Sequence, residues 1–114
     1  MTSRRISLVG LGTVLFVNAG SAYAVWLTGD DLYRFMERTE KANVFEMGVY
    51  AGYIQGVSDS LINTVCVPPG TNVRKLTDVV SSFIKANPNT RKSPDAAVIV
   101  ADSLKRAFPC RTKK

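Results

Sequence analysis

The sequence predicts an all-α domain: a small bundle of four or slightly more helices, held by one disulfide, that follows a cleaved signal peptide. Four segments carry apolar residues at helical spacing, and none shows the clean two-residue alternation of a strand. The 114 residues are enough for one domain. Cys66 and Cys110 are the only cysteines, so a single pairing is possible.

Residues 1–24 have the pattern of an export signal. The basic pair Arg4-Arg5 precedes an apolar stretch over 6–17, and Ala22-Tyr23-Ala24 is a typical cleavage site. The stretch is too short for a transmembrane anchor, which needs about 20 apolar residues. A twin-arginine signal is the weaker alternative, because only the arginine pair matches it. We therefore expect a mature domain over 25–114 in the periplasm, without a stable membrane anchor.

Export bears directly on the two cysteines. A domain of this size buries only about 60–65% of its unfolded surface, so it benefits from a covalent staple. The periplasm is oxidising and permits a Cys66–Cys110 disulfide. The alternative is a pair of free reactive thiols, but the chain has neither histidine nor a C-x-x-C motif.

The first helix is expected from Thr28 to about Thr39, because Asp31 stands three residues after Thr28 and completes a near capping box. The second is expected from about Asn43 to Asn63. On one face of this second helix three glycines recur at intervals of four residues: Gly48, Gly52 and Gly56.

Each glycine in that row costs roughly 1 kcal/mol relative to alanine in a helix. The row therefore indicates that another backbone approaches closely. Two interpretations remain open at this point. The neighbour is either another helix of the same chain or a second copy of the chain in a homodimer.

Thr71 is expected to cap the third helix, which Pro88 ends. Ser93 is expected to cap the fourth, with Pro94 at its first position, where a missing N–H costs nothing. Pro109 stops the fourth helix just before Cys110. The two apolar stripes consist of Val73, Leu76, Val80, Phe83 and Ile84, and of Ala97, Val100, Ala101, Leu104 and Phe108.

The polar, basic segment 87–93 between the last two helices is the candidate contact with a partner. It is short, and a disulfide after the fourth helix would help to anchor it, so binding would cost little conformational entropy. Arg91 could bind a carboxylate bidentately. The alternative is an ordinary helix connector. The candidate contact residues are Asn87, Asn89, Thr90, Arg91 and Lys92.

The composition of the chain gives no reason to expect catalysis. The absence of histidine removes imidazole bases, nucleophile partners and imidazole zinc ligands, and two cysteines are too few for a thiolate metal cage. Glu46 and Asp59 lie about 20 Å apart on one helix, too far for an acid–base pair. We expect no catalytic residue, no metal and no cofactor.

Charge is distributed unevenly along the chain. Residues 25–66 carry three basic and six acidic groups, whereas 67–114 carry ten basic and three acidic groups. A basic half can attract an acidic protein partner, or it can serve solubility alone. Nucleic acid is excluded as a partner by export and by the lack of aromatic residues among the basic ones.

Four motifs stand out in the second half of the chain. They are Tyr53-Ile54-x-Gly56-Val57-x-Asp59, Cys66-Val67-Pro68-Pro69-Gly70-Thr71, Asn87-Pro88-x-x-Arg91 and Ala107-Phe108-Pro109-Cys110. In these motifs the sequence resembles the Rap/Tai family, small periplasmic immunity proteins that act against type VI secretion amidase effectors. The resemblance covers about Tyr50 to Cys110.

The resemblance implies an all-helical fold, the disulfide and often a homodimer. It also implies binding to a peptidoglycan amidase, whose cleft is covered by a loop or helix end. Lys92 departs from the pattern, because the family commonly has histidine after the arginine that Arg91 matches. The alternative function is a periplasmic stress chaperone or holdase, which suppression of client aggregation at low pH would favour.

Overall fold

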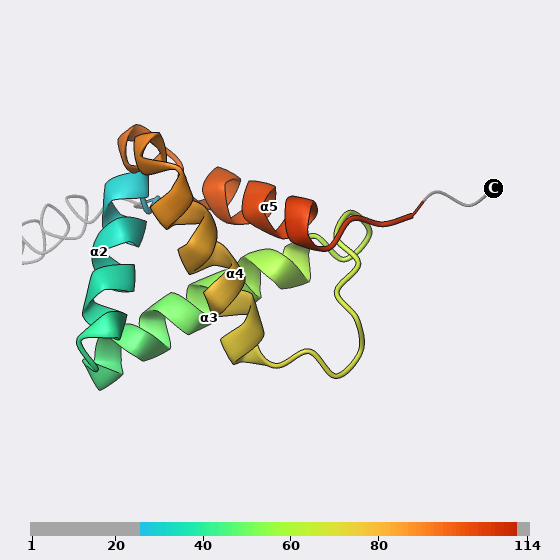
Figure 1. Cartoon of the computed structure of the whole chain (residues 1–114), viewed down its shortest axis with the longest axis horizontal. Coiled ribbons are helices and arrows are strands. Elements are labelled where there is room, and N and C mark those ends of the chain that lie inside the picture. Colours follow the sequence, from blue (N-terminus) through green and yellow to red (C-terminus); the bar gives the residue numbers. More distant parts are fainter. Residues whose placement is uncertain (1–25, 112–114) are drawn as a thin grey trace, which may run out of the picture.

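The computed structural model describes residues 26–111, and within them the chain is all helical, with only an isolated bridge between Val65 and Pro109 (Figure 1). The all-α prediction is therefore confirmed. The export signal predicted over 1–24 lies outside the described residues. None of the described helices is long and apolar enough to cross a bilayer. The elements are α2 (Gly29–Glu40), α3 (Val44–Ser60), α4 (Val73–Ala86), the 3₁₀ helix η1 (Pro88–Lys92) and α5 (Ala96–Ala107).

The first two helices begin where the sequence predicts. At α2 the Thr28 hydroxyl accepts a hydrogen bond from the Asp31 N–H at 3.1 Å, and Asp31 accepts one from the Thr28 N–H at 2.9 Å. This reciprocal pair is the predicted capping box. At α3 the Asn43 side chain accepts from the Glu46 N–H. The helix ends at Ser60, earlier than predicted, because the chain turns there to bring Val65 beside the end of α5.

Two predicted caps are each wrong by one or two residues. Asn72, not Thr71, caps α4, because the Thr71 hydroxyl is used in the preceding turn, where it donates to the Pro68 carbonyl at 2.7 Å. Asp95, not Ser93, caps α5 and accepts from the Ala97 N–H at 3.0 Å. The helix therefore starts after Pro94 rather than at it.

The core lies among α2, α3, α4 and α5, and α4 crosses α3 within it (Figure 1). Tyr50 is the largest fully buried side chain, and its hydroxyl shares a hydrogen bond of 2.8 Å with Ser81. All four described α-helices contribute to this one cluster, whereas η1 contributes no buried residue. The buried apolar residues are Leu32, Met36, Tyr50, Ile54, Val65, Leu76, Val80, Ile84, Ala96, Ile99, Val100 and Leu104.

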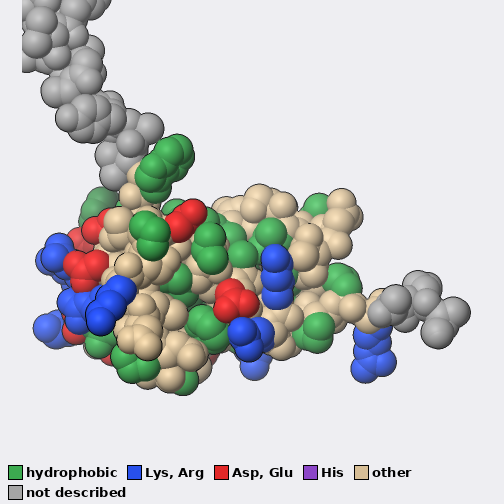
Figure 2. Space-filling model, turned by 90° about the horizontal axis from the view of Figure 1, so that it is seen from above, with side chains coloured by type: hydrophobic (Ala, Val, Ile, Leu, Met, Phe, Trp, Pro, Cys, Tyr) green, Lys and Arg blue, Asp and Glu red, His purple; other side chains and the backbone are tan. Residues whose placement is uncertain are grey.

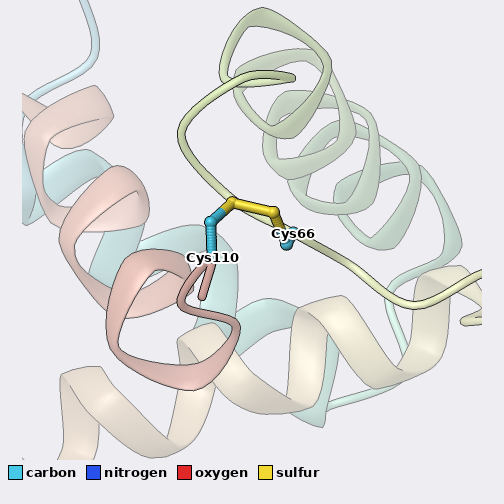
Figure 3. The surroundings of a disulfide bond; sticks show 2 residues. All are labelled: Cys66 and Cys110. Atoms are coloured by element: carbon cyan, nitrogen blue, oxygen red, sulfur yellow. A yellow bond between two sulfur atoms is a disulfide. The ribbon is translucent and has the colours of Figure 1, made fainter. Parts of the chain in front are cut away.

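The disulfide joins the segment after α3 to the segment after α5 (Figure 3). Cys66 and Cys110 lie 44 residues apart in sequence, and their Cα atoms are 4.9 Å apart. The Cys66 N–H also donates to the Phe108 carbonyl at 2.9 Å, so the bond closes a contact that the backbone already makes. Closing a loop of this length is worth about 4 kcal/mol in the chain-entropy model.

At the other end of the molecule, the start of α2 is held by the segment that leads into α5. The Gly29 N–H donates to the Ser93 carbonyl, and the Ala96 N–H donates to the Leu27 carbonyl, both at 2.8 Å. Gly29 is buried, and a Cβ atom there would overlap the carbonyl oxygen of Thr90. The absence of a side chain at Gly29 therefore allows η1 to dock against α2.

Gly29→Ala should lower the free energy of unfolding by about 1–3 kcal/mol, because the added methyl group meets a backbone carbonyl that cannot rotate away. Urea unfolding at low protein concentration measures this change. Gly48→Ala is the matched control, because a Cβ there meets nothing within 4 Å. That substitution should stabilise the helix by up to about 1 kcal/mol. Equal effects of the two substitutions would contradict the docking role of Gly29.

Candidate functional site

The predicted contact segment forms a short 3₁₀ helix, η1, beside the start of α2 (Figure 1). Pro88 occupies its first turn, where the fixed φ of proline suits a helical start. The turn is closed by the Thr90 N–H, which donates to the Asn87 carbonyl at 2.9 Å, and by the Ser93 N–H, which donates to the Thr90 carbonyl at 3.0 Å. The segment is thus a defined protrusion, not an irregular loop.

Arg91 extends from η1 back onto α2. Its Nε donates to Asp30 Oδ1 at 2.6 Å, and its guanidinium lies over the Tyr33 ring, 4.2 Å from the ring centre. Asp30 also pairs with Arg34 at 3.0 Å. The hydrogen bond from Arg91 holds the pKa of Asp30 below its ordinary value of 3.8 and raises the pKa of Arg91. Arg91 therefore braces η1 against α2.

Two further candidates serve local structure. The Asn87 side-chain amide donates to the Phe83 carbonyl at 2.8 Å and so caps the end of α4. The Thr90 hydroxyl donates to the Asn87 carbonyl at 2.7 Å. Asn89 and Lys92 differ from the other candidates, because both are exposed and neither makes a side-chain hydrogen bond or ion pair within residues 26–111. Of the five candidates, these two are open to a partner.

Gly29, Asp30 and Tyr33 contribute to this site although the sequence alone does not single them out. A pairing of Asp30 with Arg91 joins residues 61 positions apart, which no local pattern reports. The one available indication is the charge asymmetry, since an acidic first half and a basic second half can pair with each other.

The structure realises that pairing in two places. Arg91 pairs with Asp30, and Lys85 of α4 pairs with Glu40 at the end of α2. Figure 2 accordingly shows basic and acidic side chains side by side at the end of the molecule that α2 forms. Part of the basic charge of the second half is therefore neutralised within the chain.

The three glycines of α3 form an open surface. Gly48, Gly52 and Gly56 are exposed, and a Cβ on any of them would meet no atom of residues 26–111 within 4 Å. The interpretation that a helix of the same chain packs on the row is therefore wrong. The reason is that Tyr50 and Ile54 turn the opposite face of α3 into the core.

Apolar side chains surround this row in addition. Val44 and Phe45, in the first turn of α3, are 80% and 75% exposed. Further along, Gly52 and Gly56 line a shallow hollow of about 430 Å³ together with Ala97 of α5. We call the face of Val44, Phe45 and the three glycines the glycine face. It combines glycines that lower the stability of the helix with exposed apolar residues, and this combination is typical of an interface.

A larger hollow, about 640 Å³, lies among the end of α2, α3 and α4. Tyr50 and Ser81 contribute hydroxyls, and the Glu40–Lys85 ion pair forms part of its wall. Burial raises the pKa of Tyr50 to about 12, so this hydroxyl stays neutral at physiological pH. Among the described residues no three His, Cys, Asp or Glu side chains are grouped to hold a metal ion. Asp59, which the sequence places about 20 Å from Glu46 on one helix, is exposed.

Residues 28–110 match the family model of the Rap1a immunity proteins. The chain belongs to this family. No curated protein and no solved structure shows significant similarity to it. The match begins at the N-cap of α2 and ends at the second cysteine, so the Rap1a domain takes in every described helix and closes at the disulfide.

The Rap1a match extends further than the motifs that the sequence displays, which begin near Tyr50. It includes α2, whose Asp30 and Tyr33 hold η1 in place. An immunity protein binds an effector partner. The exposed residues Asn89 and Lys92 of η1 and the glycine face are therefore the surfaces of interest for binding.

The brace between Asp30 and Arg91 should make stability depend on pH. The folded-state pKa of Asp30 is depressed, so its contribution is complete above the unfolded value of 3.8 and is lost as pH falls through the folded pKa. Wild-type protein should be more stable than Asp30→Asn at neutral pH, and the two should converge below about pH 4.

Urea unfolding of both proteins across this pH range measures the difference. In an Arg91→Ala background the Asp30→Asn substitution should cost less, because the hydrogen-bond partner is already gone. A difference between wild type and Asp30→Asn that stayed constant at every pH would contradict the brace.

Proposed function

We propose that the mature chain is a periplasmic immunity protein that binds a peptidoglycan amidase delivered by type VI secretion and covers the cleft of that enzyme. Membership of the Rap1a immunity proteins carries this proposal. The predicted export signal over 1–24 supports the compartment, since peptidoglycan lies there. A general holdase has no comparable support, because the matched family consists of immunity proteins.

Occlusion by η1 suits the chemistry of such an enzyme. An amidase that cleaves peptide cross-links must admit an extended peptide, so its cleft can be filled by a short protrusion. η1 is exposed and is braced through Arg91 and Gly29, so little conformational entropy remains to be lost on binding. We assign the direct contact to Asn89 and Lys92, and a supporting role to Arg91.

Lys92 provides the charge in this contact. Its ammonium is exposed and has no ion-pair partner among residues 26–111. A charged group at the edge of an interface accelerates association with an oppositely charged partner and rejects partners of like charge. We therefore expect an acidic group of the amidase near its cleft to face Lys92.

Lys92→Glu should weaken inhibition of the cognate amidase by about tenfold or more, because attraction becomes repulsion at the edge of the interface. The measurement titrates the peptidoglycan-cleaving activity of an amidase effector from the same genome with wild-type and variant protein. High salt should slow association of the wild type and have less effect on the variant.

Lys75→Glu is the control, because it reverses the same charge at an exposed position in the opposite end of α4. It should inhibit like the wild type. Equal inhibition by Lys92→Glu and wild type would move the contact away from η1. Failure of the wild type to inhibit any such amidase would remove the amidase from the proposal.

We also propose that the chain forms a homodimer through the glycine face. Three glycines in one helix cost roughly 3 kcal/mol relative to alanine, and no packing contact among residues 26–111 offsets that cost. A two-fold axis would bring the row of one copy against the row of the other, and the missing side chains would let the backbones approach closely. Val44 and Phe45 would be buried in the same contact.

Gly52→Leu should weaken this dimer without unfolding the chain, because its side chain would enter the open space over the row. Sedimentation at tens of micromolar and circular dichroism measure the two effects separately. Lys75→Leu adds the same side chain at an exposed position of α4 and should leave the dimer intact. A wild type that sediments as a monomer under these conditions would contradict the dimer.

A further inference from the structure

A third hollow, which we call the η1 hollow, lies between the end of α4, η1 and α5, and its volume is about 410 Å³. Its apolar lining comes from Phe83, Val98 and Ile99. Val98 is unusual on α5, because it is 59% exposed whereas the neighbouring Ile99 and Val100 are buried. The hollow thus presents apolar surface to solvent next to the candidate contact segment.

Polar groups surround this apolar lining. Asn87, Asn89 and Thr90 border the hollow on the η1 side. On the α5 side, Arg106 pairs with Asp102 at 3.3 Å. The two charges of the border therefore balance each other, and the amide and hydroxyl groups of η1 remain as uncharged neighbours.

The Arg106 side chain also lies over the Phe83 ring, 5.7 Å from the ring centre. Its salt bridge to Asp102 and its contact with the ring hold it at the border rather than across the opening. The recess is therefore formed by side chains from three elements that already constrain one another.

We propose that the η1 hollow receives a large apolar side chain of the effector, and that this side chain anchors the complex. The proposal rests on the proposed function, because Asn89 belongs both to the hollow and to the assigned contact. A charged group would be repelled by one member of the Asp102–Arg106 pair as it is attracted by the other, and it would lose hydration against Phe83 and Val98. An apolar side chain meets neither penalty.

The polar border fits the backbone that carries such a side chain. The Asn89 amide is unused within residues 26–111 and can exchange hydrogen bonds with peptide groups beside the anchor. Apolar anchors that enter a recess ringed by polar groups dominate the energy of many interfaces, because the ring excludes water. Lys92 then increases the rate of association and the selectivity for the partner, while the η1 hollow provides the affinity.

The first experiment uses indole as a probe and does not require the effector. Amide chemical shifts of the isotope-labelled mature domain are recorded during an indole titration. Shifts should concentrate at Val98, Ile99 and Thr90. Val98→Trp, which fills the hollow with its own ring, should abolish them, whereas Ile62→Trp, at a site 75% exposed elsewhere, should not. Shifts that avoid the hollow would overturn the proposal.

The second experiment measures the affinity of the amidase effector for the same proteins. Val98→Trp should weaken binding by about tenfold or more, and Val98→Glu should do the same by placing a charge at the apolar lining. Ile62→Trp should bind like the wild type. Circular dichroism confirms that each variant is folded, as expected for exposed positions.

The outcomes separate this inference from the function on which it rests. Unchanged affinity of both Val98 variants, with a wild type that binds, would overturn the hollow and leave the immunity function standing. Indole binding in the hollow without any amidase binding would overturn the proposed function, and with it the effector as occupant. Loss of dimerisation in Val98→Trp would assign the hollow to a second copy of the chain and overturn the proposal.

Discussion

A Cβ atom at Gly29 would overlap the carbonyl oxygen of Thr90, so the position of η1 depends on the room that this glycine leaves. Around this contact two backbone hydrogen bonds attach Leu27 and Gly29 to the segment that enters α5. The contact needs a residue without a side chain, and Gly29 is also the first residue of α2, where its lower helix propensity costs least. One glycine thus determines how η1 lies on the rest of the molecule.

The two ends of the fold are closed by different means. At one end Cys66 and Cys110 are joined covalently, and the restraint acts mainly by limiting the unfolded chain. At the other end the restraint consists of the Gly29 contact, two hydrogen bonds and the exposed Arg91–Asp30 pair. Exposed ion pairs are individually weak, so that end relies on several small contributions acting together. The end that carries η1 is therefore held by non-covalent contacts, in contrast to the covalent closure at the opposite end.

Local sequence accounts for most of the helices and for few of the contacts. The capping box at Thr28 was predictable because both of its partners lie within four residues. The starts of α4 and α5 were less predictable, because adjacent polar residues compete for the same role. At α5 the Ser93 hydroxyl accepts from the Asp95 N–H at 3.2 Å, which leaves the capping of the helix to Asp95.

The candidate site was predictable as a segment but not as a set of roles. Composition and position identify 87–93 as polar and placed between two helices. They cannot indicate that Arg91 turns toward α2, since its partners Asp30 and Tyr33 are distant in sequence. Similarly, the spacing of the glycines shows that one face of α3 lowers the stability of the helix. Only the packing of Tyr50 into the core shows that this face points away from the core.

The two surfaces of interest meet at α5 without overlapping. Ala97 borders the hollow beside Gly52 and Gly56, whereas Val98 borders the η1 hollow. Consecutive residues of a helix point about 100° apart, so the side chains of Ala97 and Val98 lie on different sides of α5. A dimer through the glycine face would therefore use a different side of α5 from the η1 hollow. Such a dimer can bind one effector per copy. The dimer contact that the glycines allow would add to the stability of the immunity protein without using the surface proposed to bind the effector.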